Sequence, residues 1–300
     1  MEKEFINKKD EMEMIYIPSQ TYEMGSSSNV GHKLDKEGPP EVISTQNFYM
    51  SKTTVTNKQF TEFVKKTGYI TEAEKIGSSF VFYQLIDKKH WDKIQFKKTG
   101  THWWLDVIGA SWKHPEGPDS SVGNRMDHPV SHISWYDAVE YSKWADGRLP
   151  TEAEWEAVAK GNTSAQMYPW GDQLVSKGVY NANTWQGTFP SNNTKKDGYI
   201  GTAPVNKFYK DKNGIYQMIG NVWEWCLNPG QIPLKVFKDK SAKDFIRENE
   251  KEMSSLYAIR GGSFLCHHSY CNRYRSAARN SATPMSSASN VGFRYIIEEI

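Results

Sequence analysis

The sequence Arg260-Gly-Gly-Ser-Phe-Leu-Cys-His-His-Ser-Tyr-Cys-Asn-Arg-Tyr-Arg275 contains two of the three cysteines of this 300-residue chain. Cys266 and Cys271 stand five positions apart and are surrounded by hydroxyl, imidazole and guanidinium side chains. Five positions correspond to about 140° around a helix and to opposite faces of a flat strand. The two sulfur atoms can therefore meet only if the backbone turns between them.

This spacing leaves three chemical interpretations of the cysteine pair. The pair can form a disulfide, act as a dithiol redox couple, or supply two thiolates to a soft metal ion such as Cu(I). A structural zinc site needs four ligands, and the pair provides only half of that number. From the spacing alone a structural role and a functional role have equal weight, so the rest of the chain has to decide.

The composition is that of a protein with an aromatic core and balanced charge. Hydrophobic residues make up 38% of the chain, and 11 tryptophans supply apolar area in place of long aliphatic runs. The net charge of +2 gives no indication of binding to nucleic acid or to an anionic membrane. No apolar run reaches the length of a membrane span, and the charged N-terminal residues lack the apolar segment of a secretory signal. We therefore expect an intracellular protein with no nucleic-acid or membrane partner.

The chain order predicts one irregular domain. Residues 1–12 are predicted to form a polar tail, and residues 13–300 a single α+β domain, because no linker or repeat divides them. Prolines in 98–130 exclude long regular elements there. The charge-rich segment 235–256 is predicted to be a solvated helix or a loop.

Several regular elements are nevertheless expected. Strands are predicted on both sides of a Pro-Ser turn within 14–24, and another over 43–50. Apolar spacing predicts helices over 56–67, 137–145 and 149–160. In the last of these, Thr151 and Glu154 form a capping box.

A second group of residues offers oxygen atoms to a hard cation. Glu224 follows closely on Gly220 and Asn221, and Asn183 and Asp197 lie upstream in a loop rich in Asn, Gly and Asp. Calcium binds six to eight such oxygens, including backbone carbonyls of irregular loops. The same residue types are common in ordinary turns, so the pattern alone leaves a calcium site open.

A series of motifs together resembles the formylglycine-generating enzymes, also called sulfatase-modifying factors. The motifs are RLPTEAEWE (148–156), NTWQGTFP (183–190), GTAPV (201–205), GNVWEW (220–225), RGGSFLCHHSYCNRYR (260–275) and SSASNVGFR (286–294). The resemblance runs from about Met14 to the C-terminus, and its most specific part is the segment with both cysteines. It implies an α+β fold similar to the C-type-lectin-like one, with low secondary-structure content.

The resemblance also implies an activity. Members of the family oxidise a cysteine of a client sulfatase to Cα-formylglycine, using O2, Cu(I) and a thiol reductant. Their clients carry a Cys-x-Pro-x-Arg core in an unfolded segment. By position, Cys266 and Cys271 match the copper-binding pair, and Ser263 and Tyr270 match polar catalytic positions.

Further site residues follow from the same resemblance. The expected substrate-binding residues are Trp103, Trp223, Asn290 and His267, the last without a defined role. One calcium ion is expected at Asn183, Thr184, Asp197 and Tyr199. A second is expected at Gln217, Gly220, Val222 and Glu224. Gln217 stands where Asn is usual in the family, and Thr184 stands where Ile is common. Thr184 is expected to contribute only its backbone carbonyl, so the departure at Gln217 affects its site more.

The cysteines that this chain lacks indicate its compartment. Relatives of the secretory pathway carry additional structural cysteines, and the matching positions here are Ser142, Ala159, Ser276 and Tyr295. Their joint absence favours a reducing cytoplasm. Two alternative functions remain: a superfamily relative acting as a non-haem-iron sulfoxide synthase, and a non-catalytic lectin-like binding module whose cysteines merely pair.

Overall fold

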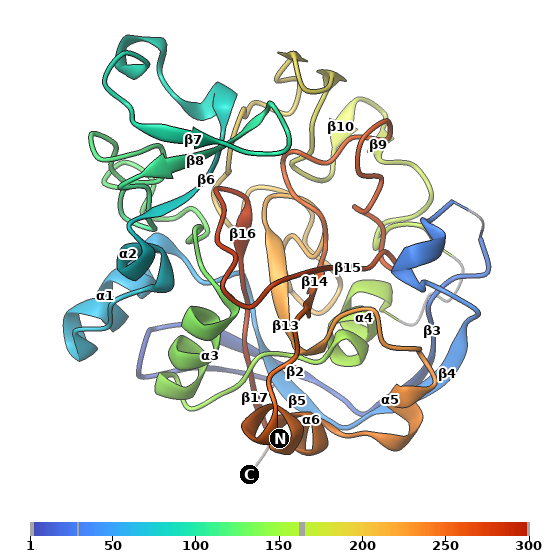
Figure 1. Cartoon of the computed structure of the whole chain (residues 1–300). Coiled ribbons are helices and arrows are strands. Elements are labelled where there is room, and N and C mark those ends of the chain that lie inside the picture. Colours follow the sequence, from blue (N-terminus) through green and yellow to red (C-terminus); the bar gives the residue numbers. More distant parts are fainter. Residues whose placement is uncertain (1–2, 29, 162–165, 299–300) are drawn as a thin grey trace.

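The computed structural model describes residues 3–28, 30–161 and 166–298 (Figure 1). Within these ranges the strands form two four-stranded sheets, one three-stranded sheet and three two-stranded ribbons. Helices and long loops separate them, which is the irregular α+β architecture that the sequence predicts. The outermost residues of the expected tail and domain, 1–2 and 299–300, lie outside the described residues.

The first four-stranded sheet brings the two ends of the chain together. Its order is β1 (Glu4–Ile6), β2 (Glu13–Ile17), β5 (Phe48–Ser51) and β17 (Ile296–Glu298), and every neighbouring pair is antiparallel.

The expectation of a polar tail is wrong for residues 4–12. The β1 strand pairs with β2, and the buried carboxylate of Asp10 accepts hydrogen bonds from the hydroxyls of Tyr141 (2.6 Å) and Tyr295 (3.0 Å). The polar residues of this segment thus satisfy buried partners far along the chain, which their charge alone does not reveal.

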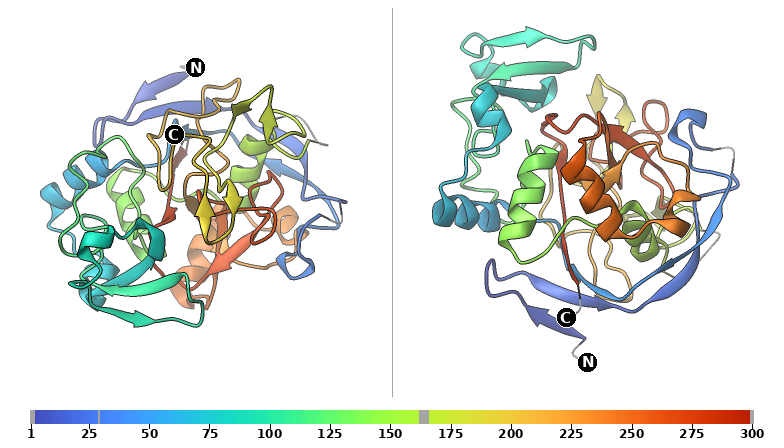
Figure 2. Two further views of the ribbon diagram at one scale, coloured as in Figure 1. Left: turned by 90° about the horizontal axis from the view of Figure 1, so that it is seen from above. Right: turned by 60° about the horizontal axis from the view of Figure 1, so that its bottom comes forward.

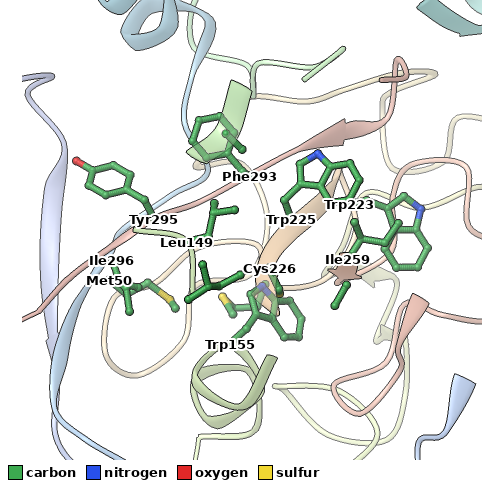
Figure 3. Close-up of a cluster of buried hydrophobic side chains, with 14 of the residues drawn as sticks. Met50, Leu149, Trp155, Trp223, Trp225, Cys226, Ile259, Phe293, Tyr295 and Ile296 are labelled. Atoms are coloured by element: carbon green, nitrogen blue, oxygen red, sulfur yellow. The ribbon is translucent and has the colours of Figure 1, made fainter. Parts of the chain in front are cut away.

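The second four-stranded sheet forms the centre of the molecule. Its order is β15 (Asn280–Ala282), β14 (Tyr257–Arg260), β13 (Trp223–Pro229) and β16 (Val291–Gly292), with β13 and β16 parallel. Figure 3 shows Trp223, Trp225 and Cys226 of β13 in the main core beside Trp155. Cys226 has no exposed surface and serves as a small core residue.

The strands predicted in the N-terminal part need one correction. Both strands within 14–24 are present, as β2 and β3 (Gln20–Met24), but they belong to different sheets. The single strand predicted over 43–50 is wrong. Gln46 and Asn47 separate β4 (Glu41–Thr45), which pairs with β3, from β5 in the first sheet.

A three-stranded sheet stands at one side of the molecule (Figure 2). Its order is β6 (Ser78–Phe82), β8 (Trp104–Ile108) and β7 (Phe96–Lys98), all antiparallel. One face packs on a small core of its own that includes Val81, Leu105 and Val107. The remaining ribbons are short: β9 (Val175–Ser176) with β10 (Val179–Tyr180), and β11 (Gly187–Thr188) with β12 (Asn192–Asn193).

The three predicted helices are confirmed as α1 (Asn57–Thr67), α3 (Trp135–Trp144) and α4 (Glu152–Lys160). The capping box of Thr151 and Glu154 is present at the start of α4. The remaining helices are α2 (Glu72–Ile76), α5 (Val236–Asp239) and α6 (Ala242–Lys251), with single 3-10 turns η1 (Lys33–Asp35), η2 (Tyr83–Leu85) and η3 (Lys88–His90). No helix in the described part of the chain is both long and apolar enough to cross a lipid bilayer.

Buried ion pairs fasten α4 to the strand that precedes the cysteine segment. Glu156 accepts a hydrogen bond from Arg260 at 2.5 Å, and Glu152 accepts two from Arg279 at 2.8 and 2.6 Å. Burial alone would raise the pKa of both carboxyl groups. The charges of the neighbouring guanidinium groups have the larger effect, so the pKa of each carboxyl group is lowered. The Arg260 pair holds the C-terminal end of β14, where the cysteine segment begins, and the Arg279 pair holds the chain just before β15, after that segment.

Candidate functional site

The backbone between the two cysteines makes a tight turn. The carbonyl oxygen of His267 accepts hydrogen bonds from the backbone amides of Tyr270, Cys271 and Asn272, at 3.0, 2.9 and 3.1 Å. Asn272 then adopts the left-handed conformation, with φ at 49°, and ends the turn. The turn supplies the reversal of the chain that the spacing requires for a converging pair.

The two thiols lie together beneath the surface. Cys266 and Cys271 are 2% and 5% exposed, and their side chains are hydrogen-bonded to each other. All three cysteines are free thiols. Burial raises the pKa of the Cys266 thiol well above its usual range. The pKa of Cys271 is lowered, because the hydrogen bond from Cys266 and the nearby Arg273 guanidinium outweigh its burial.

The Gly261–Gly262 pair gives the backbone the shape that this segment needs. Both glycines have positive φ, at 90° and 74°. A Cβ atom on Gly262 would lie 3.0 Å from the Cα of Tyr274, and one on Gly261 would lie 2.8 Å from the carbonyl oxygen of Met218. The chain thus packs closely on both sides as it leaves β14, which fixes the position of Ser263.

Two predicted polar residues meet at the cysteine pair. The side-chain amide of Asn290 donates a hydrogen bond to the Ser263 hydroxyl at 2.9 Å, and the Ser263 carbonyl accepts one from the Cys266 amide at 2.9 Å. Both side chains are buried. The structure therefore brings Ser263, Cys266, Cys271 and Asn290 into one site.

Aromatic side chains form the exposed wall of this site. Tyr270 is 40% exposed, stacks on Phe189 with ring centroids 4.1 Å apart, and meets Trp103 edge-on at 5.4 Å. The loop that carries Phe189 is tied to the turn, since the backbone amide of Trp185 donates to the Cys266 carbonyl at 3.1 Å. Sequence reasoning did not single out Phe189, although it lies in the NTWQGTFP motif.

Trp223 and His267 have different positions from the wall residues. Trp223 is 6% exposed and packs in the main core (Figure 3), while its backbone amide donates to the Asn290 carbonyl at 2.8 Å. His267 is half-buried, and its ring lies 2.8 Å from the Ser269 hydroxyl. Its backbone carbonyl makes the turn described above. Trp223 thus supports Asn290 from the core, and the His267 ring lies at the rim.

A loop from the N-terminal part of the chain also contacts the cysteine turn, and sequence reasoning missed it. The His32 ring donates to the Cys271 carbonyl at 3.1 Å. Arg275 forms a bidentate ion pair with Glu37, with both distances 2.7 Å. These partners are more than 230 residues apart, and nothing in the composition of the loop identifies them as a pair.

At the first expected calcium site, two of the four predicted residues lie around one side chain. The side-chain amide of Gln186 donates to the Thr184 carbonyl and, at 2.7 Å, to the Asp197 carboxylate. The Tyr199 amide also donates to Asp197, at 3.0 Å. Burial raises the pKa of Asp197. The Thr184 and Asp197 oxygens thus converge on one positively polarised group, which is the donor arrangement that a hard cation prefers. The Asn183 amide instead donates to Asn221 and Gly201.

The second expected calcium site has mixed features. The Gln217 side-chain oxygen is buried and has no hydrogen-bond partner among the described residues, so it is free to bind a cation. The Glu224 carboxylate already accepts from Arg294, at 2.6 and 2.8 Å, and from Trp155 at 2.7 Å. Across residues 3–28, 30–161 and 166–298, no three His, Cys, Asp or Glu side chains gather around a common point. Any cation here would depend on carbonyl oxygens, including those of Gly220 and Val222.

Comparison with known proteins identifies the family. The family described as "Sulfatase-modifying factor enzyme 1-like domain" matches residues 3–299. A formylglycine-generating enzyme of Bos taurus is 46% identical over 94% of this chain and 73% of its own length. The chain belongs to the formylglycine-generating enzyme family. A bacterial member, from Thermomonospora curvata, is 45% identical over 94% of this chain and 92% of its own length.

Two further comparisons show that similarity of sequence or of fold does not by itself establish the activity. An "Inactive C-alpha-formylglycine-generating enzyme 2" of Bos taurus is 36% identical over 94% of this chain and 84% of its own length. The structure of PvdO from Pseudomonas aeruginosa shares the fold, with a TM-score of 0.69 at 23% identity over 99% of this chain and 98% of that one. A relative of similar sequence is thus described as inactive, so the residues of the site have to support the activity.

Proposed function

We propose that this protein is a copper-dependent formylglycine-generating oxidase. It converts a cysteine in an unfolded client sulfatase, within a Cys-x-Pro-x-Arg segment, to Cα-formylglycine. The observation that carries this proposal is the buried pair of adjacent free thiols, Cys266 and Cys271, beneath an aromatic wall. A purely structural pair would gain stability as a disulfide, whereas two reduced thiols in one site are suited to hold a soft ion.

The donor set of the cysteine pair fits Cu(I). Two thiol sulfurs are soft ligands, and they leave room for a third sulfur from the client. Cys266 and Cys271 would hold the ion, and copper, when bound, supplies the redox chemistry for O2. O2 accepts four electrons in the balanced reaction, two from the client carbon and two from a thiol reductant. The products are the aldehyde, hydrogen sulfide, one water and the disulfide of the reductant.

The residues around the pair orient the client and limit the access of water. Asn290 fixes the Ser263 hydroxyl, so that a polar group of set orientation faces the thiols. Tyr270, Phe189 and Trp103 pack together beside the cysteine turn and offer flat apolar area to an extended peptide. His267, at the rim, lies where it can contact the client chain.

Calcium has a structural role in this proposal. The Thr184 and Asp197 oxygens would bind one ion after the Gln186 amide moves away, together with Asn183 and Tyr199. The orphan oxygen of Gln217 favours a second ion near Glu224. Both sites flank the loops that support the cysteine turn, so bound calcium would stabilise the turn and leave the chemistry to the thiols.

The cytoplasm is the compartment that suits these thiols. Three free cysteines, of which two must stay reduced to act, favour a reducing environment that also contains thiol reductants. A client that must be unfolded would then be met before it folds or is exported.

One observation argues against the sulfoxide synthase alternative. Within the described ranges no cluster of histidines and acids is present, and a non-haem iron site is built from such a cluster. His132 is buried, and its ring lies 2.8 Å from the Ser79 hydroxyl, so it serves a structural contact.

Mass spectrometry of a Cys-Ala-Pro-Ala-Arg peptide tests the proposal. The peptide is incubated with the protein, Cu(I), a thiol reductant and O2, and parallel samples lack copper or O2. The expected result is loss of the thiol and appearance of an aldehyde only in the complete mixture. An unchanged peptide in the complete mixture would favour the binding-module alternative, and restoration by iron but not copper would favour the sulfoxide synthase.

A further inference from the structure

The exposed histidines of this protein gather around the cysteine turn. The chain has eight histidines, and the three that are exposed are His32, His102 and His268. His32 contacts the Cys271 carbonyl, and His268 belongs to the turn itself. His102 meets Trp103 of the aromatic wall edge-on, with ring centroids 4.7 Å apart. The exposed imidazoles of the chain therefore all lie at the rim of the thiol site.

The histidines elsewhere in the molecule are less exposed and have local partners. Each of these rings lies within 4 Å of a polar atom of a neighbouring residue; they are His90, His114, His128 and His132. Their contacts account for them as structural residues. The rim is thus the part of the molecule where imidazole groups are open to a ligand from solution.

Two of the rim histidines form a pair of adjacent rings. His267 and His268 follow Cys266 directly, and their ring centroids are 4.0 Å apart with 46° between the ring planes. Within the described residues the His268 ring forms no hydrogen bond or ion pair, so its lone pair is available. Two imidazoles at this separation can approach one small ligand together.

The contacts of His267 leave its Nε2 atom available as well. Its Nδ1 atom lies 2.8 Å from the Ser269 hydroxyl and 3.3 Å from the Ser269 amide. When Nδ1 carries the ring proton, it donates to the hydroxyl, and the lone pair of the neutral ring is on Nε2. Histidines that bind metal ions commonly use one nitrogen in this way while the other donates to a fixed partner. A metal ion at Nε2 would select this tautomer, at the expense of the longer contact with the amide.

The thiols need a route by which an ion can reach them. Cys266 and Cys271 are only 2% and 5% exposed, so an ion from solution passes the rim before it meets sulfur. His267 is the nearest such rim residue, because consecutive Cα atoms are about 3.8 Å apart. Its carbonyl oxygen also accepts the Cys271 amide, so one residue is fixed to both cysteines.

The ligand types and the charges around the turn favour inward movement of a soft cation. Imidazole binds copper, but thiolate is the softer ligand and holds Cu(I) more strongly. The two guanidinium groups that follow the turn are neutralised, since Arg273 pairs with Asp35 and Arg275 pairs with Glu37. An ion held weakly at the rim would therefore pass to the thiols without strong repulsion.

We propose that His267 and His268 form a copper entry site, in which two neutral imidazoles take Cu(I) from solution and pass it to the thiols of Cys266 and Cys271. The ion is neither oxidised nor reduced in this step. Two Cu–N bonds break, two Cu–S bonds form, and the two thiol protons leave to solvent. The destination of the ion rests on the proposed function, whereas binding by the imidazole pair does not.

The rate of copper loading tests the entry site. Metal-free protein is mixed without O2 with a chromophoric chelator that carries Cu(I), under conditions in which the rate depends on protein concentration. The variant is His268→Phe, which keeps a ring and removes its nitrogens. The matched control is His102→Phe, at an exposed histidine that contacts Trp103 instead of a second imidazole. His268→Phe is expected to slow loading roughly tenfold, because one imidazole remains in place of two, and the control is expected to load at the wild-type rate.

The final state of the loaded protein distinguishes an entry site from a permanent ligand. In His268→Phe the equilibrium affinity for Cu(I) and the kcat of the fully loaded protein are expected to be unchanged, because the thiols hold the ion after transfer. Equal loading rates in the wild type and His268→Phe would overturn the proposal. Slower loading with a weaker final affinity would also overturn it, because His268 would then contribute to the copper site itself.

A variant without the two thiols separates this proposal from the proposed function. Cys266→Ser/Cys271→Ser retains the imidazole pair and is expected to bind Cu(I) weakly, and adding His268→Phe is expected to abolish that binding. If this pattern holds but the loaded wild type converts no peptide, the entry site stands and the oxidase does not. Copper binding by the double variant that does not depend on His268 would show that the ion is held elsewhere, and the proposal would be wrong.

Discussion

We predict that the ion pair between Arg275 and Glu37 is one of the main contacts that stabilise the cysteine turn. The two side chains are 3% and 6% exposed and form a bidentate contact, and Arg275 also donates to the Asn272 carbonyl at 2.9 Å. In Arg275→Met, Glu37 would remain buried without its cation. Removing one partner of such a buried pair costs about 3–5 kcal/mol of unfolding free energy, which corresponds to roughly 5–8 °C in Tm for a chain of this size.

Two assays read this perturbation. Chemical unfolding followed by tryptophan fluorescence gives the loss of stability, and the rate at which a thiol reagent labels Cys271 reports the release of the turn. The matched control is Lys58→Met, which breaks the contact of Lys58 with Glu11, where the two side chains are 65% and 78% exposed. That control is expected to change stability by no more than about 0.5 kcal/mol. Equal stability of the two variants, with unchanged labelling, would refute the reasoning.

Four further predictions follow from other contacts. Gly262→Ala is expected to reduce Cu(I) affinity in a chelator competition, because its φ of 74° and the 3.0 Å approach to Tyr274 leave no room for a Cβ; unchanged affinity would contradict this. Asn290→Ala is expected to lower kcat more than it raises KM, since Ser263 loses the donor that orients it; a change in KM alone would contradict this. The contribution of Glu152 to the unfolding free energy is expected to be fully present above about pH 4.5 and to be lost below it, because its pKa is lower in the folded chain than in the unfolded one. The difference in unfolding free energy between the wild type and Glu152→Gln should therefore shrink as the pH falls below about 4.5, and a difference that is independent of pH would contradict this. Calcium at 100 times its Kd is expected to add about 2.7 kcal/mol to the free energy of unfolding, and Gln217→Ala should reduce that gain. An unchanged gain in this variant would exclude the second calcium site.

Local signals in the sequence were sufficient to predict the helices α1, α3 and α4. Thr151 and Glu154 identify the start of α4 because a capping box is made by residues three positions apart. The strands of the first sheet were harder, because β2 and β3 are adjacent in sequence but pair in different sheets. Register and sheet membership depend on partners far along the chain, which hydrophobic patterns do not specify.

The same difference between local signals and distant partners decides which parts of the candidate site could be predicted. The cysteine pair was visible because two rare residues stand close together, and the requirement for a turn followed from their spacing. The loop that contains His32 and Glu37 was not visible, because its partners lie beyond residue 270. The ion pairs of Glu152 and Glu156 on α4 were not visible either, because a buried ion pair and a solvated charge have the same sequence. Phe189 lay inside a motif but lacked a local feature that distinguishes it from a core aromatic.

The most direct test of the central claim combines Cu(I) binding and turnover in matched cysteine variants. Cys271→Ser removes one proposed ligand, and Cys226→Ala removes the core thiol that lies outside the site. Cu(I) stoichiometry is measured by competition with a chromophoric chelator, and conversion of Cys-Ala-Pro-Ala-Arg by mass spectrometry. The wild type and Cys226→Ala are expected to bind about one Cu(I) and to form the aldehyde, while Cys271→Ser does neither. Full conversion by Cys271→Ser prepared without copper would contradict the account.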